Sequence, residues 1–537
     1  MTDVLKKLPI SINSLQKIVE RNMVYVDKTA YAWELAREPG GYFLSRPRRF
    51  GKSLFLNTLK ELFEGNEQLF RGLFIHDRWD WSIQYPVIEI DFAGGVLQNR
   101  KELDEAIFEI LQRNQTRLGV ECRAKSVAGC FGELIDNVQA KYGRRVVVLV
   151  DEYDKPILDN IENPQVAVSM REGVKNFYSV IKSRDAQIQF VFMTGVSRFS
   201  KVSLFSGLNQ LNDITLSRRF STVCGYTQDD IEAIFSAHLV GVDRDKLKFW
   251  YNGYCFLGEP VYNPYDILLF IDRDRSYRNY WFETGSPSFL IKLFLKNRYF
   301  LPDLERIEVS EEVLDSFDVE RVNPVTLLFQ TGYLTVESTR THLQRFMFKL
   351  KIPNQEVRTA FSDQLINAYT GLENEKFGLQ SQLYDILVQG DAEGLIRTIK
   401  GLFAGVPWRY FTQNNLPEAE GYYAGVLYAF FSSINAEVIP EDISSHGQVD
   451  LTVKIGEYIY IIEVKVDRSP SSSAGKDDTN PALQQIRDRG YSRKYAAVSC
   501  KNIFEIGLIF SSKERNVIRA DWIQVRPDGV FVSLRKP

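Results

Sequence analysis

Residues suited to phosphate chemistry stand together in one stretch, Ser45-Arg46-Pro47-Arg48-Arg49-Phe50-Gly51-Lys52-Ser53. An apolar run precedes it, and leucines at helical spacing follow it. A loop that joins a strand to a helix N-terminus presents backbone N–H groups to a phosphate, while the Lys52 ammonium adds a cation and the Ser53 hydroxyl suits Mg²⁺. The usual pattern G-x-x-x-x-G-K-[ST] begins with glycine, but here Arg46 replaces it and Pro47 removes one N–H donor. The pattern alone leaves two interpretations open, a phosphate-binding loop or a basic turn that caps a helix.

A second chemical signal is a pair of carboxylates, Asp151 and Glu152, at the end of an unbroken apolar run. Such a run predicts a parallel strand buried on both faces, and the C-terminal ends of such strands are where open α/β sheets bind ligands. We expect Asp151 to hold Mg²⁺ through water and Glu152 to orient or deprotonate an attacking water. The alternative is a strand that simply ends at an acidic loop. Because both signals occur in this order, about a hundred residues apart, we favour a P-loop NTPase.

A third signal lies in a hairpin between Gln448 and Val466. Gly456-Glu457 suits a two-residue type II′ turn, which would pair Ile455 with Tyr458. Counting back pairs Asp450 with Glu463 and puts Lys465 on the same face, because side chains alternate with period two. Opposed carboxylates ~5 Å apart repel, and a divalent cation would relieve this repulsion and activate water for phosphodiester attack. The alternative is an exposed hairpin face with unrelated charges.

Composition sets the outer limits. The 537 residues allow about two to four domains, and the 44% apolar fraction is ordinary for a globular protein. The net charge of −3 means that any nucleic-acid surface must be local. The five cysteines and four histidines are scattered, so neither a disulfide framework nor a zinc site is indicated. No signal peptide or membrane-length apolar run is present, and we expect a cytoplasmic protein with no membrane partner.

Alternating β and α segments predict a mostly parallel sheet with helices on both faces. We expect an ATPase-like domain over 1–230, a mainly helical lid with winged-helix elements over 231–370, a helical linker over 371–415 and a second α/β domain over 416–537. Aromatic residues between 250 and 281 could stack bases, but among leucines and isoleucines we favour a core role.

Three features flank the hairpin. Glu420 begins a helix with an apolar stripe and is expected to point toward the sheet, although it could be a helix-start acid favoured by the macrodipole. Residues 469–481 are rich in serine, glycine and charge, which predicts a mobile loop that could close over nucleic acid. Gln485 lies on a later helix.

Further motifs accompany the loop and the acidic strand end. They are Val26-Asp27-Lys28-Thr29, Val150-Asp151-Glu152-Tyr153-Asp154-Lys155-Pro156, Thr194-Gly195-Val196-Ser197-Arg198-Phe199-Ser200-Lys201, Phe205-Ser206-Gly207-Leu208-Asn209 and Tyr280-Trp281-Phe282-Glu283-Thr284-Gly285. Together with residues 45–53 they resemble, over nearly the whole chain, the AAA-ATPase-like proteins that carry a C-terminal PD-(D/E)XK nuclease domain. The Arg-Pro-Arg-Arg-Phe variant of the loop is itself a family feature. The resemblance implies an α/β multidomain protein, in which a P-loop NTPase parallel sheet with a helical lid precedes a PD-(D/E)XK nuclease-like α/β domain.

The resemblance also implies site residues. ATP and Mg²⁺ (or Mn²⁺) are expected as cofactors, with these residues at the nucleotide: Arg49, Gly51, Lys52, Ser53, Asp151, Glu152, Thr194 and Arg198. Thr194 would be the sensor between phosphate and water. Arg198, Lys201, Arg218 or Arg219 would contact the γ-phosphate, in cis or from a neighbouring subunit of a homo-oligomer, unless these are only solvated basic residues.

In the C-terminal domain, Asp450, Glu463 and Lys465 match the family's D-x(n)-E-x-K core, Glu420 matches its helix carboxylate, and Gln485 would contact substrate. We therefore expect ATP-controlled, metal-dependent cleavage of nucleic acid, with DNA favoured over RNA. The alternatives are an ATP-driven switch that binds nucleic acid without cutting it, and an NTPase whose C-terminal domain only contacts proteins.

Overall fold

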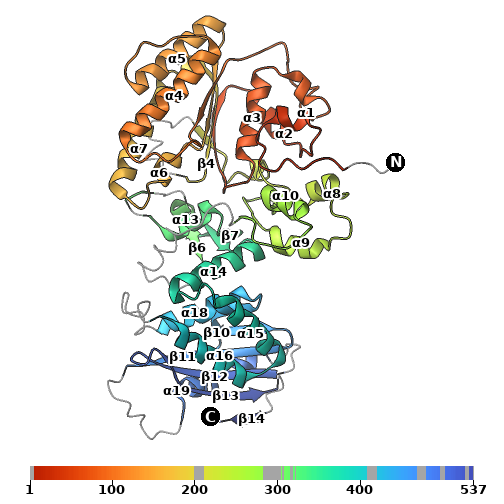
Figure 1. Cartoon of the computed structure of the whole chain (residues 1–537), viewed down its shortest axis with the longest axis vertical. Coiled ribbons are helices and arrows are strands. Elements are labelled where there is room, and N and C mark those ends of the chain that lie inside the picture. Colours follow the sequence, from red (N-terminus) through yellow and green to blue (C-terminus); the bar gives the residue numbers. More distant parts are fainter. Residues whose placement is uncertain are drawn as a thin grey trace. The chain divides into compact units, whose positions relative to one another are not determined.

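The computed structural model describes residues 5–198, 211–281, 304, 307–314, 318–320, 322–407, 420–468, 479–495, 502–526 and, for the backbone, 531–535. The chain divides into two compact units (Figure 1). The first comprises Met1–Gly285 with Glu308–Asn354, and the second comprises Ser286–Ile307 with Gln355–Pro537. Parts of two motifs, at 199–201 and 282–285, the whole motif at 205–209 and the loop segment 469–478 lie outside the described residues.

The first unit is built on a five-stranded, fully parallel sheet in the order β2-β3-β4-β1-β5. Its strands are β1 (Gly40–Ser45), β2 (Val87–Asp91), β3 (Val146–Asp151), β4 (Ile188–Gly195) and β5 (Leu211–Asp213). The apolar runs predicted as strands are confirmed, and every residue of β3 is buried because the sheet is covered on both faces. β4 lies between the strand that enters the loop and the strand that ends in carboxylates.

Helices cover this sheet from two sides. They are α1 (Leu15–Glu20), α2 (Thr29–Ala36), α3 (Lys52–Phe63), α4 (Arg100–Leu118), α5 (Val127–Tyr142), α6 (Lys155–Leu158) and α7 (Pro164–Ser183). Figure 1 shows α4, α5 and α7 on one side of the sheet and α1, α2 and α3 on the other. Local signals set their ends: side chains of Asn99, Ser126 and Asn163 cap the starts of α4, α5 and α7.

Three short helices follow, α8 (Gln228–Ile234), α9 (Arg244–Tyr251) and α10 (Pro264–Asp272). Their apolar faces form one core that also takes in Val24 and Val26 from the start of the chain. Four aromatic side chains of the expected core are fully buried there or beside it, Tyr251, Tyr254, Tyr262 and Tyr280. The core interpretation of these aromatics is confirmed.

The first unit ends in a small group of two helices and three strands, which we call the winged-helix arrangement after the order of its elements. Its elements are β6 (Glu308–Ser310), α12 (Glu311–Leu314), α13 (Pro324–Thr331), β7 (Thr335–His342) and β8 (Arg345–Lys351). The strands form an antiparallel sheet in the order β6-β8-β7, so β7 and β8 make the hairpin that follows the helices.

The second unit contains a six-stranded sheet in the order β14-β13-β12-β11-β10-β9. Its strands are β9 (Glu437–Ser444), β10 (Gly447–Ile455), β11 (Tyr458–Asp467), β12 (Asn502–Ser511), β13 (Asn516–Val525) and β14 (Phe531–Arg535). Only β11 and β12 are parallel, and every other neighbouring pair is antiparallel. The hairpin predicted from its turn is β10–β11.

The helices of the second unit are α14 (Gln355–Thr370), α15 (Lys376–Gln389), α16 (Ala392–Gly405), α18 (Glu420–Ser433) and α19 (Pro481–Arg489). The side chain of Tyr460 reaches α15 and that of Glu463 reaches α19, so these helices cover opposite faces of β11. The stretch 371–415, expected as a helical linker, carries the helices α15 and α16, whose buried leucines include Leu387 and Leu395. α14, expected in the lid, groups with the second unit. Apolar stripes on these helices require a packed partner, which their buried leucines provide.

Candidate functional sites

The loop between β1 and α3 holds a buried cation at its centre. Gly51 takes a left-handed conformation with φ 91°, and α3 begins at the next residue. The Nζ atom of Lys52 donates hydrogen bonds to the carbonyl oxygens of Arg46 and Pro47, each at 3.0 Å. Burial lowers the pKa of Lys52, while the nearby Asp151 and Glu152 oppose that shift. The loop thus keeps a desolvated ammonium group next to the carboxylates at the end of β3.

Arg46, which stands where the usual pattern has glycine, is part of the fold. Its side chain is 1% exposed, and its guanidinium donates to the carbonyl oxygens of Ser45, Thr215 and Phe220. The guanidinium carbon also lies 3.9 Å from the ring centre of Phe256. Burial lowers the pKa of Arg46 to about 10. This side chain fastens the loop to segments more than 150 residues away, so it explains the departure from the pattern.

The carboxylate of Asp151 lies beside Ser53. Burial raises the pKa of Asp151 to about 6, while a hydrogen bond with Ser53 and the charge of Lys52 lower it. A hydroxyl and a carboxylate oxygen at this point fit Mg²⁺, which prefers oxygen ligands and retains water. Glu152 follows in a left-handed conformation, φ 48°, and its amide donates to Asp151 Oδ1 at 3.0 Å. Backbone outliers of this kind cluster at functional sites.

Three other residues expected at the nucleotide have partners within the fold. The hydroxyl of Thr194 donates to the carbonyl oxygen of Leu44 at 2.9 Å, so in this structure it serves the junction of β4 and β1. Arg198 forms an ion pair with Asp213. The guanidinium of Arg49 lies 4.9 Å from the ring centre of Tyr265.

Three further basic residues were expected near the γ-phosphate, Lys201, Arg218 and Arg219. Arg219 forms an ion pair with Glu34, and Lys201 lies outside the described residues. Arg218 lies in a short 3₁₀ helix at Arg218–Phe220. The structure therefore brings Lys52, Ser53 and Asp151 together, whereas Arg49, Arg198 and Arg219 contact Tyr265, Asp213 and Glu34.

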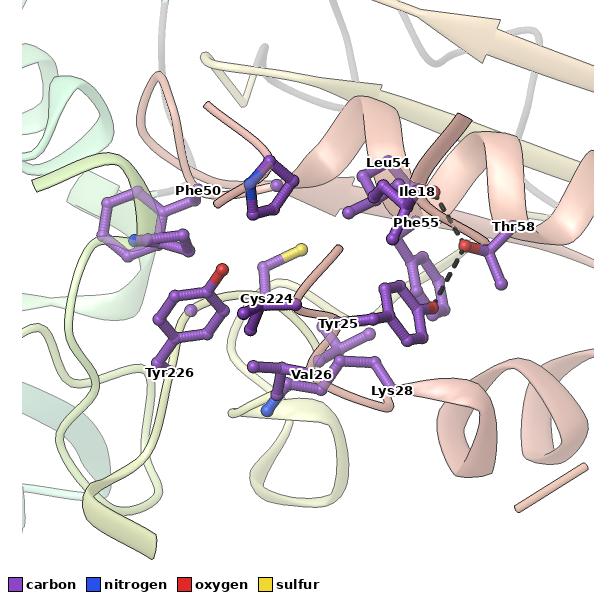
Figure 2. A pocket seen from close by; sticks show the side chains of 16 residues that line it. Ile18, Tyr25, Val26, Lys28, Phe50, Leu54, Phe55, Thr58, Cys224 and Tyr226 are labelled. Carbon is purple, nitrogen blue, oxygen red and sulfur yellow. Dashed lines mark hydrogen bonds between the residues drawn. The ribbon is translucent and has the colours of Figure 1, made fainter. Parts of the chain in front are cut away.

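A cavity of about 60 Å³ lies beside Gly51, and sequence reasoning did not find it. Figure 2 shows Phe50, Cys224 and Tyr226 toward one end and Tyr25 with Thr58 at the other. The full lining is Pro9, Ile18, Val24, Tyr25, Val26, Lys28, Phe50, Gly51, Leu54, Phe55, Thr58, Val223, Cys224, Gly225, Tyr226 and Pro264. Mostly apolar walls with few polar groups suit a planar ring. The Val26–Thr29 motif was the available signal, because it contributes two of these residues.

The β10–β11 hairpin has the register that its turn predicts. Ile455 pairs with Tyr458, the pairing continues to Leu451 with Ile462, and Gly456 takes φ 55°. One step further, the amide of Asp450 donates to Glu463 Oε2 at 3.3 Å. The amide of Val464 donates to Asp450 Oδ2 at 2.7 Å. The two carboxylates therefore face each other across the hairpin.

Three more residues join this carboxylate pair. Lys465 Nζ lies 3.0 Å from Glu463 Oε1 and 3.9 Å from Glu420 Oε2. Gln485, expected to contact substrate, donates its amide to Glu463 instead, which makes it a positioning contact in this structure. The expected set of Glu420, Asp450, Glu463, Lys465 and Gln485 is thus assembled from α18, β10, β11 and α19.

Burial raises the pKa of both carboxylates at this site. Burial and then Glu463 raise the pKa of Asp450 to about 7. Burial likewise raises the pKa of Glu463, against the effect of Lys465. Burial alone would lower the pKa of Lys465, but its bond to Glu463 leaves that pKa raised. Within the described ranges, no group of three or more His, Cys, Asp or Glu side chains is gathered for a metal. Asp450 and Glu463 fit as ligands of a divalent ion, with water and phosphate oxygens completing its coordination shell.

Comparison with known proteins agrees with both halves. Residues 9–205 match the family described as "Predicted AAA-ATPase", and residues 418–520 match the "PD-(D/E)XK nuclease superfamily". The chain belongs to the AAA-ATPase-like proteins with a C-terminal PD-(D/E)XK nuclease superfamily domain. It is 45% identical over 515 residues to a protein of Azotobacter chroococcum mcd 1 named "Uncharacterized protein in vnfD 5'region", covering 96% of this chain and 98% of that one. In the part of the chain that the structure describes, no helix is long and apolar enough to cross a membrane.

Proposed function

We propose that this protein binds and hydrolyses ATP and cleaves phosphodiester bonds of nucleic acid, with ATP controlling the cleavage. The observation that carries the proposal is the facing pair Asp450 and Glu463 with Lys465 beside it, in a domain of the PD-(D/E)XK nuclease superfamily. DNA as the substrate, a homo-oligomeric assembly and a cytoplasmic location belong to the same proposal.

At the hairpin site, Asp450 and Glu463 would hold the Mg²⁺ or Mn²⁺ ion. The ion would supply positive charge at the scissile phosphate and a water of lowered pKa. Lys465 would stabilise the negative charge that develops on the phosphate, because a fixed cation costs no reorganisation during the reaction. Gln485 would keep the Glu463 carboxylate oriented, and Glu420 would hold Lys465 from its other side.

At the loop site, Lys52 would exchange the two loop carbonyls for the β- and γ-phosphates. Ser53 and Asp151 would hold Mg²⁺, Glu152 would orient the attacking water, and the cavity beside Gly51 would take the base. Thr194 or Arg198 would reach the phosphates only after leaving Leu44 or Asp213.

Contacts of the loop with the winged-helix arrangement support ATP control. A Cβ added to Gly332, where α13 ends, would lie 2.8 Å from the Cβ of Pro47, so loop and helix end touch closely. Gln330 accepts from the backbone N–H of Arg198 at 3.1 Å. The chain then runs through β7 and β8 into the larger segment of the second unit, Gln355–Pro537. A change in the loop would reach the segment that leads to the nuclease unit.

The test is to incubate purified protein with duplex and single-stranded DNA and with RNA, with and without ATP and with Mg²⁺, Mn²⁺ or EDTA. We expect metal-dependent cleavage that Glu463→Gln abolishes and that Lys52→Ala makes insensitive to ATP. Binding without cleavage under every condition would favour the ATP-driven switch. No nucleic-acid binding at all would favour the protein-contact alternative.

A further inference from the structure

The β7–β8 hairpin is the exposed part of the winged-helix arrangement. In α13, every residue from Val325 to Gln330 is buried, and Gln330 contacts Arg198 and Leu314. This helix therefore has no free face with which to read a partner. By contrast, each side chain from Arg340 to Phe346 is exposed, so the hairpin extends beyond the core.

The basic residues of this hairpin share one face. His342 pairs with Arg345, Arg340 with Met347 and Ser338 with Lys349, so Arg340, His342, Arg345 and Lys349 project to the same side. Between Thr335 and Lys351 the sequence has four Lys or Arg residues and one Glu, a formal charge of +3 in a chain of −3. The hairpin is thus a local positive strip on a slightly acidic protein.

The tip of the hairpin carries an apolar side chain on strained backbone. Leu343 is 83% exposed, and Leu343 and Gln344 both take positive φ, 46° and 62°. A two-residue turn of this type prefers asparagine and glycine, and a left-handed conformation costs a leucine about 1–2 kcal/mol. Neither burial nor turn preference explains a leucine here.

We propose that the β7–β8 hairpin binds duplex DNA, with its basic face along the sugar-phosphate backbone and Leu343 in the groove. The inference rests on the proposed nuclease function and names its substrate class. Duplex DNA fits because its charged backbone matches the positive strip and its grooves accept an apolar tip between base steps. The ion pairs of Arg340 with Glu308 and Lys349 with Glu337 are exposed, so phosphates can replace the carboxylates at little cost.

The first measurement is the affinity of the full-length protein for a fluorescent DNA duplex in EDTA, over a range of salt concentrations. Arg345→Gln/Lys349→Gln should weaken binding on the order of 10-fold and reduce the salt dependence by about two counterions. The matched control is Lys101→Gln/Arg113→Gln, two exposed basic residues of α4, which should leave both quantities unchanged.

The second variant, Leu343→Asn, separates binding from folding. Asparagine adopts left-handed backbone readily, so the melting temperature should stay equal or rise. Duplex affinity should nevertheless fall, because the apolar tip is gone. A leucine with a merely structural role would leave the affinity unchanged.

Several results would overturn the inference. They are the absence of duplex binding by the wild type, equal affinity in the hairpin variants, equal or tighter binding of single strands or RNA, and equally effective competition by polyglutamate. Because binding is measured without metal, it does not depend on cleavage. Hairpin-dependent binding with no cleavage in any metal would refute the proposed nuclease alone. Cleavage with unchanged kcat/KM in the hairpin variants would refute the hairpin alone.

Discussion

Each of the two candidate sites contains a buried carboxylate with a raised pKa. Asp151 and Asp450 are carboxylates in places with little water, and burial is the main reason that their pKa values rise to about 6 and about 7. Each lies near further acids, Asp91 and Glu152 in one case and Glu463 in the other. A divalent cation would favour the ionised form of both carboxylates. It would thereby offset the free energy that burial costs the ionised groups, and this is the physical basis for its binding.

The pH dependence of stability should reveal this cost at Asp450. Between pH about 4 and about 7, this aspartate is ionised in the unfolded chain but protonated in the folded protein. The free energy of unfolding of the metal-free protein should therefore fall as the pH rises through that window. Asp450→Asn should lack this part of the decline. Urea unfolding of the second unit in EDTA at several pH values measures it, and parallel curves for the two proteins would contradict the assignment.

Restoring the usual glycine should harm this loop. Arg46→Gly removes a buried guanidinium that satisfies carbonyl oxygens of Thr215 and Phe220. We expect a loss of ~3 kcal/mol in the free energy of unfolding and no gain in ATP affinity. Arg48→Gly, at an exposed position of the same loop, is the matched control and should cost much less. Equal effects would mean that the Arg46 contacts do not stabilise the loop.

Glu152→Gln should separate nucleotide binding from hydrolysis. The amide keeps the size of the side chain but cannot orient or deprotonate the water, so the ATPase rate should fall about 100-fold or more. ATP affinity, measured by calorimetry, should remain close to that of the wild type. Unchanged turnover would remove Glu152 from the mechanism.

At the scale of elements, the junction of α13 with the phosphate loop connects the nucleotide to the rest of the chain. Gly332, the residue that follows α13, takes φ 93° and lies directly against Pro47. A left-handed helix end needs glycine for backbone reasons alone, but here the missing side chain also leaves room for the loop.

A matched pair of glycines tests this junction. Gly332→Ala and Gly143→Ala both place alanine at a left-handed helix end, and backbone strain alone should cost each about 1 kcal/mol of stability. Only Gly332→Ala meets Pro47, whereas a Cβ at Gly143 meets nothing within 4 Å. ATP affinity should therefore fall in Gly332→Ala alone. Equal affinity in both variants would show that the junction does not affect the loop.

For the molecule as a whole, the division into two units predicts two separate responses to ligands. Calorimetry should show two unfolding transitions. MgATP should raise one of them, and Lys52→Ala should block that shift. Mn²⁺ without nucleotide should raise the other, and Asp450→Ala should block it. A single transition that responds to both ligands, or variants that block both shifts, would contradict this independence.

The sequence by itself determined the features that depend on interactions between neighbouring residues. The short apolar run before Asp151 is a strand because its valines favour extended backbone that is buried on both faces, and β3 ends where the carboxylates begin. The register that opposes Asp450 and Glu463 follows from one turn, Gly456-Glu457, and the period of two. Such features depend on local geometry, so one chain is enough to predict them.

What only the tertiary structure decided involves residues far apart in the chain. No local pattern shows that Arg46 binds carbonyls of Thr215 and Phe220, that Gln485 donates to Glu463, or that the cavity beside Gly51 is closed by residues near 25 and 224. The same holds for the contact between Pro47 and Gly332 at the end of α13. It also holds for the burial of α13, which leaves the β7–β8 hairpin as the exposed part. These contacts arise because each apolar surface buries itself against whichever segment has a matching shape, and that choice is made only when the whole unit packs.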